Sequence, residues 1–335
     1  MRRLAPLLVC AAAACGDDGN AKPADAAVDV PIDMPADALI DAPAPQPDFH
    51  HYVMDTLRVP TNNNEARDFG LDLNGDGTVD NQLGMVIGTF ASQGFQIQTA
   101  TTTQVDHGQV LELFRVYARA FATEPVATFN AYAGATPMPA PCAGASDTVC
   151  RRHLAGSGTF TIAPSSPTNQ PLGGSFANGM MTTQAGHLLA PVTIFTPATM
   201  PVYVTLVGAK AQVSMASDGA LMQLKLTGGV TQADVDGKLI PAMQVGIQAQ
   251  VTKDCTMPGN PPACGCAANT TGKTMLDLFD GDISGTQKDC MVSVQEIRGS
   301  SLIQSLLAPD VMLEGQMCLS YGVRASAVRA GFVAP

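Results

Sequence analysis

Short hydrophobic runs separated by Gly, Asn and Asp turns dominate the chain beyond residue 48. Several of these runs alternate apolar and polar positions and are rich in Val, Leu and Thr, a pattern typical of strands. The expected strands are residues 110–122, 126–133, 159–163, 191–195, 202–215, 220–226 and 316–323. The Ser217-Asp218-Gly219 step between two of them favours a hairpin turn.

Fewer segments show the three-to-four-residue periodicity of helices. The expected helices are residues 61–69, 82–92, 231–247, 273–279 and 293–307. Pro241 is expected to kink or end the third of these. No internal repeat indicates a propeller or solenoid. We therefore predict a mainly β domain, a sandwich or an open barrel, with a few peripheral helices.

The N-terminal residues have neither pattern. Met1-Arg2-Arg3 is a basic head, the apolar run after it is too short to span a bilayer, and three alanines precede Cys15. These features resemble bacterial lipoprotein signal peptides, over residues 1–16 only, and imply lipid attachment to Cys15. Cys10 fits less well because Val9 precedes it. The alternative is an ordinary cleaved signal peptide with an incidental cysteine.

Residues 16–48 contain eight Asp, six Pro and a single Lys. Five of the aspartates recur every four residues, which would place like charges on one helix face, and the prolines break any such helix. Because no aromatic residue precedes Phe49, the segment cannot bury a core. We predict a signal peptide over residues 1–15, a disordered tether over 16–48 and a globular domain over 49–335.

The net charge of −11, without a basic cluster, gives no indication of a nucleic-acid partner. Residues 267–274 fit a phosphate-binding loop only loosely, and we expect no nucleotide. The histidines form no spaced pair of metal ligands. Asp106-His107 suggests a dyad, but no motif supplies a nucleophile. We therefore expect no catalytic residues and no enzymatic activity.

The sharpest chemical motif spans residues 72–80, hereafter the 72–80 loop, and follows D-x-N-x-D-G-x-x-D. The side chains of Asp72, Asn74, Asp76 and Asp80, with the carbonyl of Thr78, can converge on one ion around a glycine turn. Oxygen ligands without His or Cys favour Ca²⁺. The alternative is a solvated turn, in which the three carboxylates would repel one another.

The 72–80 loop resembles the calcium loops of EF-hand proteins and of extracellular repeat proteins. The expected helices on either side support an EF-hand-like helix-loop-helix. Leu83 departs from the EF-hand pattern, since it stands where a bidentate Glu is expected. This departure favours a nine-residue variant, or a site completed by a distant carboxylate or water.

A second acidic segment matches only the back half of an EF-hand loop. Its candidate ligands are Asp280, Asp282, Asp289, Ser293 and Glu296. Gly285 and Cys290 occupy the positions at which the front half of the pattern fails. The alternative is an acidic surface loop before a helix.

The cysteines beyond the tether are expected to form disulfides, since an exported protein meets an oxidising environment. Cys142 and Cys150 bracket a short loop and are expected to pair. Cys255, Cys264, Cys266 and Cys290 pair either as 255–264 with 266–290 or as 255–266 with 264–290. A four-cysteine zinc site is the alternative for these residues, although paired C-x-x-C knuckles are missing. Cys318 is left over and is expected to be a buried strand thiol.

Together these features predict a calcium-binding lipoprotein of the cell envelope, at the outer membrane or cell surface. The whole chain is similar in composition to exported lipoproteins of myxobacteria, a likeness that implies no activity. The expected role is a binding or structural module with a protein or polysaccharide partner. The alternative is a secreted hydrolase acting on extracellular polymers.

Overall fold

The computed structural model describes residues 48–334, apart from residues 93, 148, 169, 194–200, 257–263 and 282–287. The predicted signal peptide, the lipidation site at Cys15 and all but the last residue of the predicted tether lie outside the described residues. So do Asp282 and the end of the strand expected at 191–195. Contacts group residues 45–335 into one compact unit.

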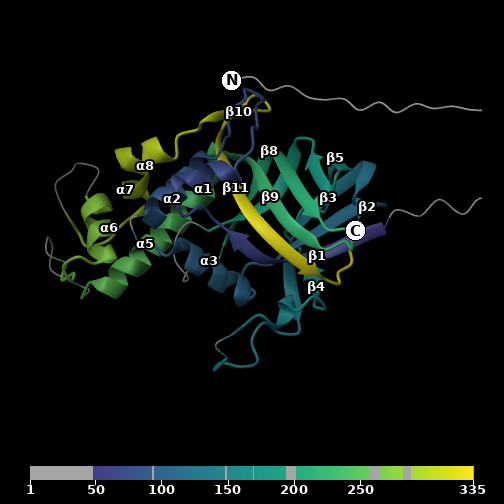
Figure 1. The fold of residues 1–335 in the computed structure, drawn as a ribbon. Helices are drawn as coiled ribbons and strands as arrows, with labels where there is room; N and C mark the ends of the chain where they lie inside the picture. The colour runs from purple at the N-terminus through teal and green to yellow at the C-terminus, as the bar shows by residue number, and fades with distance from the viewer. Residues whose placement is uncertain are drawn as a thin grey trace, which may run out of the picture. The chain divides into compact units, whose positions relative to one another are not determined.

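Eight antiparallel strands close into a barrel, because β1 pairs with β2 on one side and with β11 on the other (Figure 1). In order around the barrel they are β1 (Asp48–Arg58), β2 (Glu112–Ala118), β3 (Thr123–Met138), β5 (Leu172–Ala177), β6 (Met180–Thr183), β8 (Val202–Met215), β9 (Leu221–Thr231) and β11 (Gln316–Arg329). This order follows the chain, so the barrel is an up-and-down meander. The mainly β prediction is confirmed, and the expected sandwich or open barrel is corrected to a closed barrel.

Three short strands pair outside the closed ring. They are β4 (Thr159–Ile162) on β3, β7 (Gly186–Val192) on β8, and β10 (Val311–Leu313) on β11. The β7–β8 hairpin is held to the barrel by tyrosines, since the Tyr203 hydroxyl donates to the Leu111 carbonyl at 3.0 Å. Tyr321 of β11 donates to the Pro191 carbonyl at 3.1 Å. These bonds fix β7 and the start of β8 beside β2 and β11.

Alternate residues of each barrel strand fill the interior. Phe114 of β2 lies opposite Tyr52 and Ala131, so the three share one face. Its ring centroid is 5.5 Å from that of Phe129, and all the aromatic rings in this group are at most 1% exposed. An eight-stranded barrel has room for little more than its own side chains. The interior is therefore a packed core.

Helices cover part of the outer surface of the barrel. In chain order they are α1 (Asn63–Phe69), α2 (Gln82–Ser92), α3 (Ile97–Asp106), the 3₁₀ turn η1 (Arg152–Leu154), α4 (Gln232–Asp234), the π-helical turn η2 (Val235–Leu239), α5 (Ile240–Asp254), α6 (Thr271–Phe279), α7 (Val294–Gly299) and α8 (Ser301–Leu306). Helices α1 and α2 contact β11, and α3 contacts β1. Helices α5 to α8 lie together on the α2 side (Figure 1).

Most predicted elements are present with shifted ends. The helix expected at 82–92 is confirmed by α2, and the strand expected at 202–215 by β8. The helix expected at 231–247 continues to Asp254, and Pro241 does not end it. A π-helical turn precedes this proline, which occupies the first turn of α5, where a missing N–H costs little. The helix expected at 293–307 is broken at Ser300, whose backbone is extended.

Candidate metal sites

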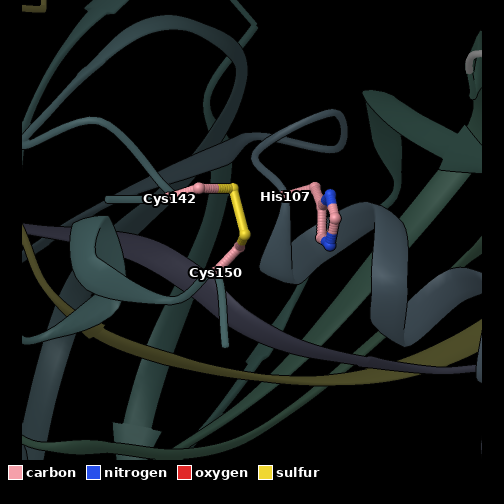
Figure 2. Close-up of side chains that lie close together, drawn as sticks. All are labelled: His107, Cys142 and Cys150. Carbon is pink, nitrogen blue, oxygen red and sulfur yellow. A yellow bond between two sulfur atoms is a disulfide. The ribbon is translucent and has the colours of Figure 1, made fainter. Parts of the chain in front are cut away.

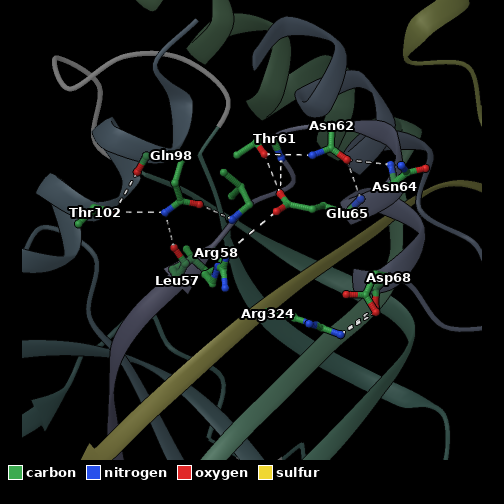
Figure 3. Close-up of polar contacts among 11 residues, drawn as sticks. Leu57, Arg58, Thr61, Asn62, Asn64, Glu65, Asp68, Gln98, Thr102 and Arg324 are labelled. Carbon is green, nitrogen blue, oxygen red and sulfur yellow. Dashed lines mark hydrogen bonds and ion pairs between the residues drawn. The ribbon is translucent and has the colours of Figure 1, made fainter. Parts of the chain in front are cut away.

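The helix before the 72–80 loop is fixed at both ends by polar contacts (Figure 3). The Asn62 side chain caps α1 by accepting hydrogen bonds from the backbone N–H groups of Asn64 and Glu65, both at 3.0 Å. At the other end, Arg324 of β11 pairs with Asp68 at 2.7 Å. The loop therefore starts from a helix that is already attached to the barrel.

The front of the loop is organised around its two glycines. Gly75 and Gly77 have φ of 83° and 87°, the left-handed region that glycine adopts at no steric cost. The Asp72 carboxylate accepts hydrogen bonds from the N–H groups of both, at 2.6 and 2.9 Å. Asp76 accepts from the Thr78 N–H at 2.7 Å and from the Asn74 amide at 3.0 Å. These bonds lower the pKa of Asp76, the Asn74 bond first.

Asp80 closes the loop from a buried position. Its carboxylate accepts a hydrogen bond from the Leu73 N–H at 2.7 Å, and its backbone pairs with Leu71 as an antiparallel bridge. Burial raises the pKa of Asp80 above its ordinary value of 3.8 more than the Leu73 bond lowers it. The charges of Asp310, Asp76 and Asp72 also raise this pKa. The back of the loop is thus a place where a negative charge is unfavourable without a cation.

Asn81, directly after the loop, attaches it to the barrel wall. Its side chain is 1% exposed, donates to the Gly322 carbonyl at 3.0 Å and accepts from the Gly322 N–H at 2.7 Å. The last pair of β1 with β11 is Arg58 with Arg324, so at Gly322 the edge of β11 is open and Asn81 takes the place of a neighbouring strand. A Cβ atom at residue 322 would lie 3.0 Å from the Phe69 carbonyl oxygen and 3.1 Å from the Asn81 amide nitrogen, so a larger residue there would require these groups to shift.

Two further contacts hold the loop from the β8 side. Lys210 donates through Nζ to the Asp72 carbonyl at 2.8 Å. Leu73 packs in a small hydrophobic cluster with Val207, Val311, Leu313 and Cys318. The loop is therefore a joint between the α1–α2 pair and the barrel.

Leu83 is completely buried in the main core, so its position supplies no ligand to the loop. The Asp310 carboxylate lies near enough to Asp80 to raise its pKa. Asp310 is itself held by the N–H and hydroxyl of Ser320, at 2.7 and 2.5 Å. Among the described carboxylates, Asp310 is thus a long-range candidate to complete the site.

The second acidic segment brings together three of its five predicted ligands. Carboxylate oxygens of Asp280, Asp289 and Glu296 lie within 4.8 Å of one another. The Ser293 hydroxyl instead caps α7 by accepting from the Glu296 N–H at 3.2 Å. The three aspartates of the 72–80 loop do not form such a group within the described residues, because Asp72 and Asp76 face the loop's own amides. Whether either segment binds metal stays a prediction.

The acidic groups of the second cluster also accept backbone hydrogen bonds. Asp280, 4% exposed, accepts from the N–H groups of Asp289 and Cys290, both at 3.0 Å. Glu296 accepts from the Gly281 N–H at 3.2 Å. Burial raises the pKa of Asp280, and its acidic neighbours act in the same direction. Because backbone N–H groups donate to these carboxylates, the hydrogen bonds alone can hold the cluster together as a folded turn that contains no ion.

Within the described part of the chain three disulfides form, Cys142–Cys150, Cys255–Cys266 and Cys264–Cys290. The expected first pair is confirmed, and of the two alternatives for the other four cysteines the second is correct. Cys318 is a buried free thiol at the start of β11, as predicted. The Cys264–Cys290 bond anchors the second acidic segment to the region after α5.

Sequence reasoning misses Glu112, and it considers His107 only as part of an Asp106-His107 dyad and not beside a disulfide. Glu112 is completely buried on the inner face of β2, and neither carboxyl oxygen has a hydrogen-bond partner in the described part of the chain. Burial raises its pKa well above 4.5. His107 lies beside the Cys142–Cys150 disulfide. Neither placement has a local sequence signal, since each depends on how distant segments pack.

Comparison of the chain with protein-family models, curated proteins and solved structures gives no match. Across the described residues, none of the helices combines the length and the apolar character needed to cross a membrane.

Proposed function

We propose that the chain is an exported lipoprotein, held at the cell envelope by a lipid on Cys15, whose barrel is a non-enzymatic binding or structural module. Ca²⁺ in the 72–80 loop stabilises the module. Helix α1, the loop and α2 then act as an EF-hand-like unit whose calcium loop ends at residue 80. The observation that carries this proposal is the joint itself. The oxygen-bearing side chains of the loop flank its glycine turn, and Asn81 anchors the loop to the barrel directly after Asp80.

The ion would be held by the side chains of Asp72, Asn74, Asp76 and Asp80 and by the Thr78 carbonyl. Ca²⁺ accepts six to eight oxygen ligands, so Asp310 or water completes the shell. The cation offsets the repulsion that burial makes costly at Asp80. At millimolar calcium, mass action contributes about 1–2 kcal/mol to the free energy of unfolding.

The proposed position of the ion favours a structural role over a catalytic one. The loop connects two helices and rests on β8 and β11, so an ion there holds the outer layer against the barrel. The predicted tether presents the barrel away from the membrane. That arrangement suits recognition of a protein or polysaccharide.

Calcium titration calorimetry on the full chain tests the site. Asp72→Asn and Asp76→Asn should each weaken binding at least about tenfold, because each removes a charged ligand. Asp289→Asn is the matched control in the second acidic cluster and should leave binding unchanged. If the wild type binds no calcium at millimolar concentration, the proposal is wrong. If only Asp289→Asn abolishes binding, the ion belongs to the second cluster.

Labelling with a palmitate analogue in a bacterial host tests the anchor. The wild type should carry the label and sediment with membranes, and Cys15→Ser should lose both properties. Cys10→Ser is the control and should behave as the wild type. Equal labelling of all three chains would contradict the assignment.

A further inference from the structure

The Cys142–Cys150 disulfide differs from the other two in its surroundings. Cys255, Cys264 and Cys290 belong to the main hydrophobic core, and Cys266 is partly buried against it. Cys150 is 2% exposed and lies outside that core. Cys142 is only half-buried, and exposed residues follow it. The Sγ atoms of Cys142 and Cys150 and one ring nitrogen of His107 lie within 4.8 Å of one another (Figure 2). His107 is exposed and Cys142 is half-buried, whereas Cys150 is buried, so small thiols can approach the disulfide from the Cys142 side.

An ion pair holds the end of the disulfide loop against the end of α3. Asp106, directly before His107, pairs with Arg151, directly after Cys150. Arg151 also donates to the Asp55 carbonyl of β1 at 2.9 Å. The end of α3 and the end of the disulfide loop are thereby clamped to the same strand. This clamp sets His107 beside the disulfide.

The turn after His107 packs closely against the residue before Cys142. Gly108 has φ of 65°, and a Cβ atom there would lie 2.6 Å from Cγ of Pro141, the residue before Cys142. The Asp147 carboxylate accepts from the Ala143 N–H at 2.6 Å and from the Val149 N–H at 3.0 Å. His107 is also close enough to lower the pKa of Asp147. The imidazole therefore has the disulfide on one side and a carboxylate within electrostatic range.

We propose that Cys142, Cys150 and His107 form a thiol–disulfide exchange site that reacts with dithiols. A thiolate of the dithiol attacks Sγ of Cys142, the S–S bond breaks, and its electron pair goes to Sγ of Cys150. The His107 imidazolium donates a proton to this leaving thiolate. The second thiol then attacks the mixed disulfide, giving its proton to Cys142. The dithiol leaves oxidised to a disulfide, and the protein holds two thiols.

The imidazole makes this exchange faster in two ways. A nearby imidazolium lowers the pKa of a thiol, and a thiol of lower pKa is a better leaving group. Proton transfer from a positioned histidine also lowers the barrier. The imidazole recovers its proton from solvent, which received it when the attacking thiol ionised. Both cysteines of Cys264–Cys290 are buried, and the Cys255–Cys266 pair, in which Cys266 is half-buried, belongs to no group with a histidine among the described residues.

The test measures reduction of the folded full chain by dithiothreitol. Free thiols are first blocked, the reduced cysteines are alkylated at set times, and each is identified by mass spectrometry. Cys142–Cys150 should open at least about tenfold faster than the other two pairs. His107→Gln should slow that opening several-fold at pH 6, and the ratio to the wild type should approach one above pH 8. His187→Gln, an exposed histidine paired with Glu314, is the control.

The pH dependence distinguishes a histidine that donates a proton to the leaving thiolate from a histidine that only supports the loop. A histidine that only supports the loop would change the rate by the same factor at every pH. Equal rates for the wild type and His107→Gln across the pH range would overturn the proposal. So would opening of Cys142–Cys150 no faster than that of the two core disulfides.

Discussion

The carboxyl group of Asp80 is buried beside other acidic groups, where ionisation is costly unless a cation is near. Its raised pKa means that stability contributed by the neutral form is present at low pH and lost as pH rises through the folded-state pKa. A bound Ca²⁺ reverses this pH dependence, because the ion binds the ionised carboxylate and not the neutral acid. Calcium and pH should therefore act on the same residue.

Asp80→Asn separates these effects. In chelator at pH 7 the variant should be as stable as the wild type or more stable, by up to about 1 kcal/mol, because the buried charge is gone and the Leu73 bond can remain. In millimolar calcium it should lose the stabilisation that the wild type gains. Denaturant unfolding followed by circular dichroism measures both. A variant less stable in chelator that keeps the calcium gain would contradict the assignment.

Glu112 gives a second residue-scale prediction. Its pKa is raised by complete burial, so the folded state holds a proton that the unfolded state releases near the ordinary value of 4.5. Stability should therefore fall as pH rises from that value toward the raised pKa. Its charge would also raise the pKa of Tyr203 and Tyr321, which burial already raises.

Glu112→Gln should flatten this pH dependence. The free energy of unfolding, measured in chelator at intervals from pH 5 to 9, should fall less steeply for the variant than for the wild type. Glu124→Gln, another buried glutamate of the barrel, controls for loss of a carboxylate. Parallel curves for wild type and Glu112→Gln would show that residue 112 does not titrate in this range.

At the scale of elements, the α1–α2 pair depends on Asn81. Its side chain makes four hydrogen bonds, to Ala66, Gly84 and both backbone groups of Gly322. Asn81→Ala removes all four bonds, although the Ala66 carbonyl keeps the bond from the Gly70 N–H, and should cost about 2–4 kcal/mol. Asn63→Ala, at an exposed position in α1, should change stability by less than about 0.5 kcal/mol. Chemical denaturation measures both. If Asn81→Ala lowers the free energy of unfolding by no more than Asn63→Ala does, Asn81 does not hold the α1–α2 pair to the barrel.

Elements with a clean local pattern were predictable from sequence, and those whose burial is set by the whole fold were not. Strand β1 was missed because Tyr52, Val53 and Met54 are all buried, between the barrel interior and the outer layer, so its sequence does not alternate. β5 was missed because Gly173 and Gly174 interrupt its apolar pattern. Pro241 does not end the helix as expected, because a π-helical turn precedes it and it lies in the first turn of α5, where a missing N–H costs little.

The same distinction applies to the sites. The ligands of the 72–80 loop are close in sequence, so their spacing can be read directly. The Asn81–Gly322 contact joins residues 241 apart, and the His107–disulfide cluster joins the end of α3 to a later loop. The three-carboxylate cluster was partly predictable, but Ser293 serves as a helix cap instead of facing it.

For the whole molecule, closure of the barrel depends on the pairing of β1 with β11, at opposite ends of the described chain. The α1–loop–α2 unit lies between these strands in sequence and packs on β11 where β1 has ended. Calcium in the loop should therefore stabilise the whole domain against unfolding, and not only one surface turn. The expected increase in unfolding temperature is about 2–6 °C for about 1–2 kcal/mol in a domain of this size.

The most direct test is thermal unfolding of the full chain in chelator and in millimolar calcium, with Asp76→Ala as the control. We predict that calcium raises the wild-type midpoint in one cooperative transition, and that Asp76→Ala, which removes an exposed ligand, has the chelator midpoint in both conditions. A wild-type midpoint that does not move with calcium would contradict the account, as would an equal rise in Asp76→Ala.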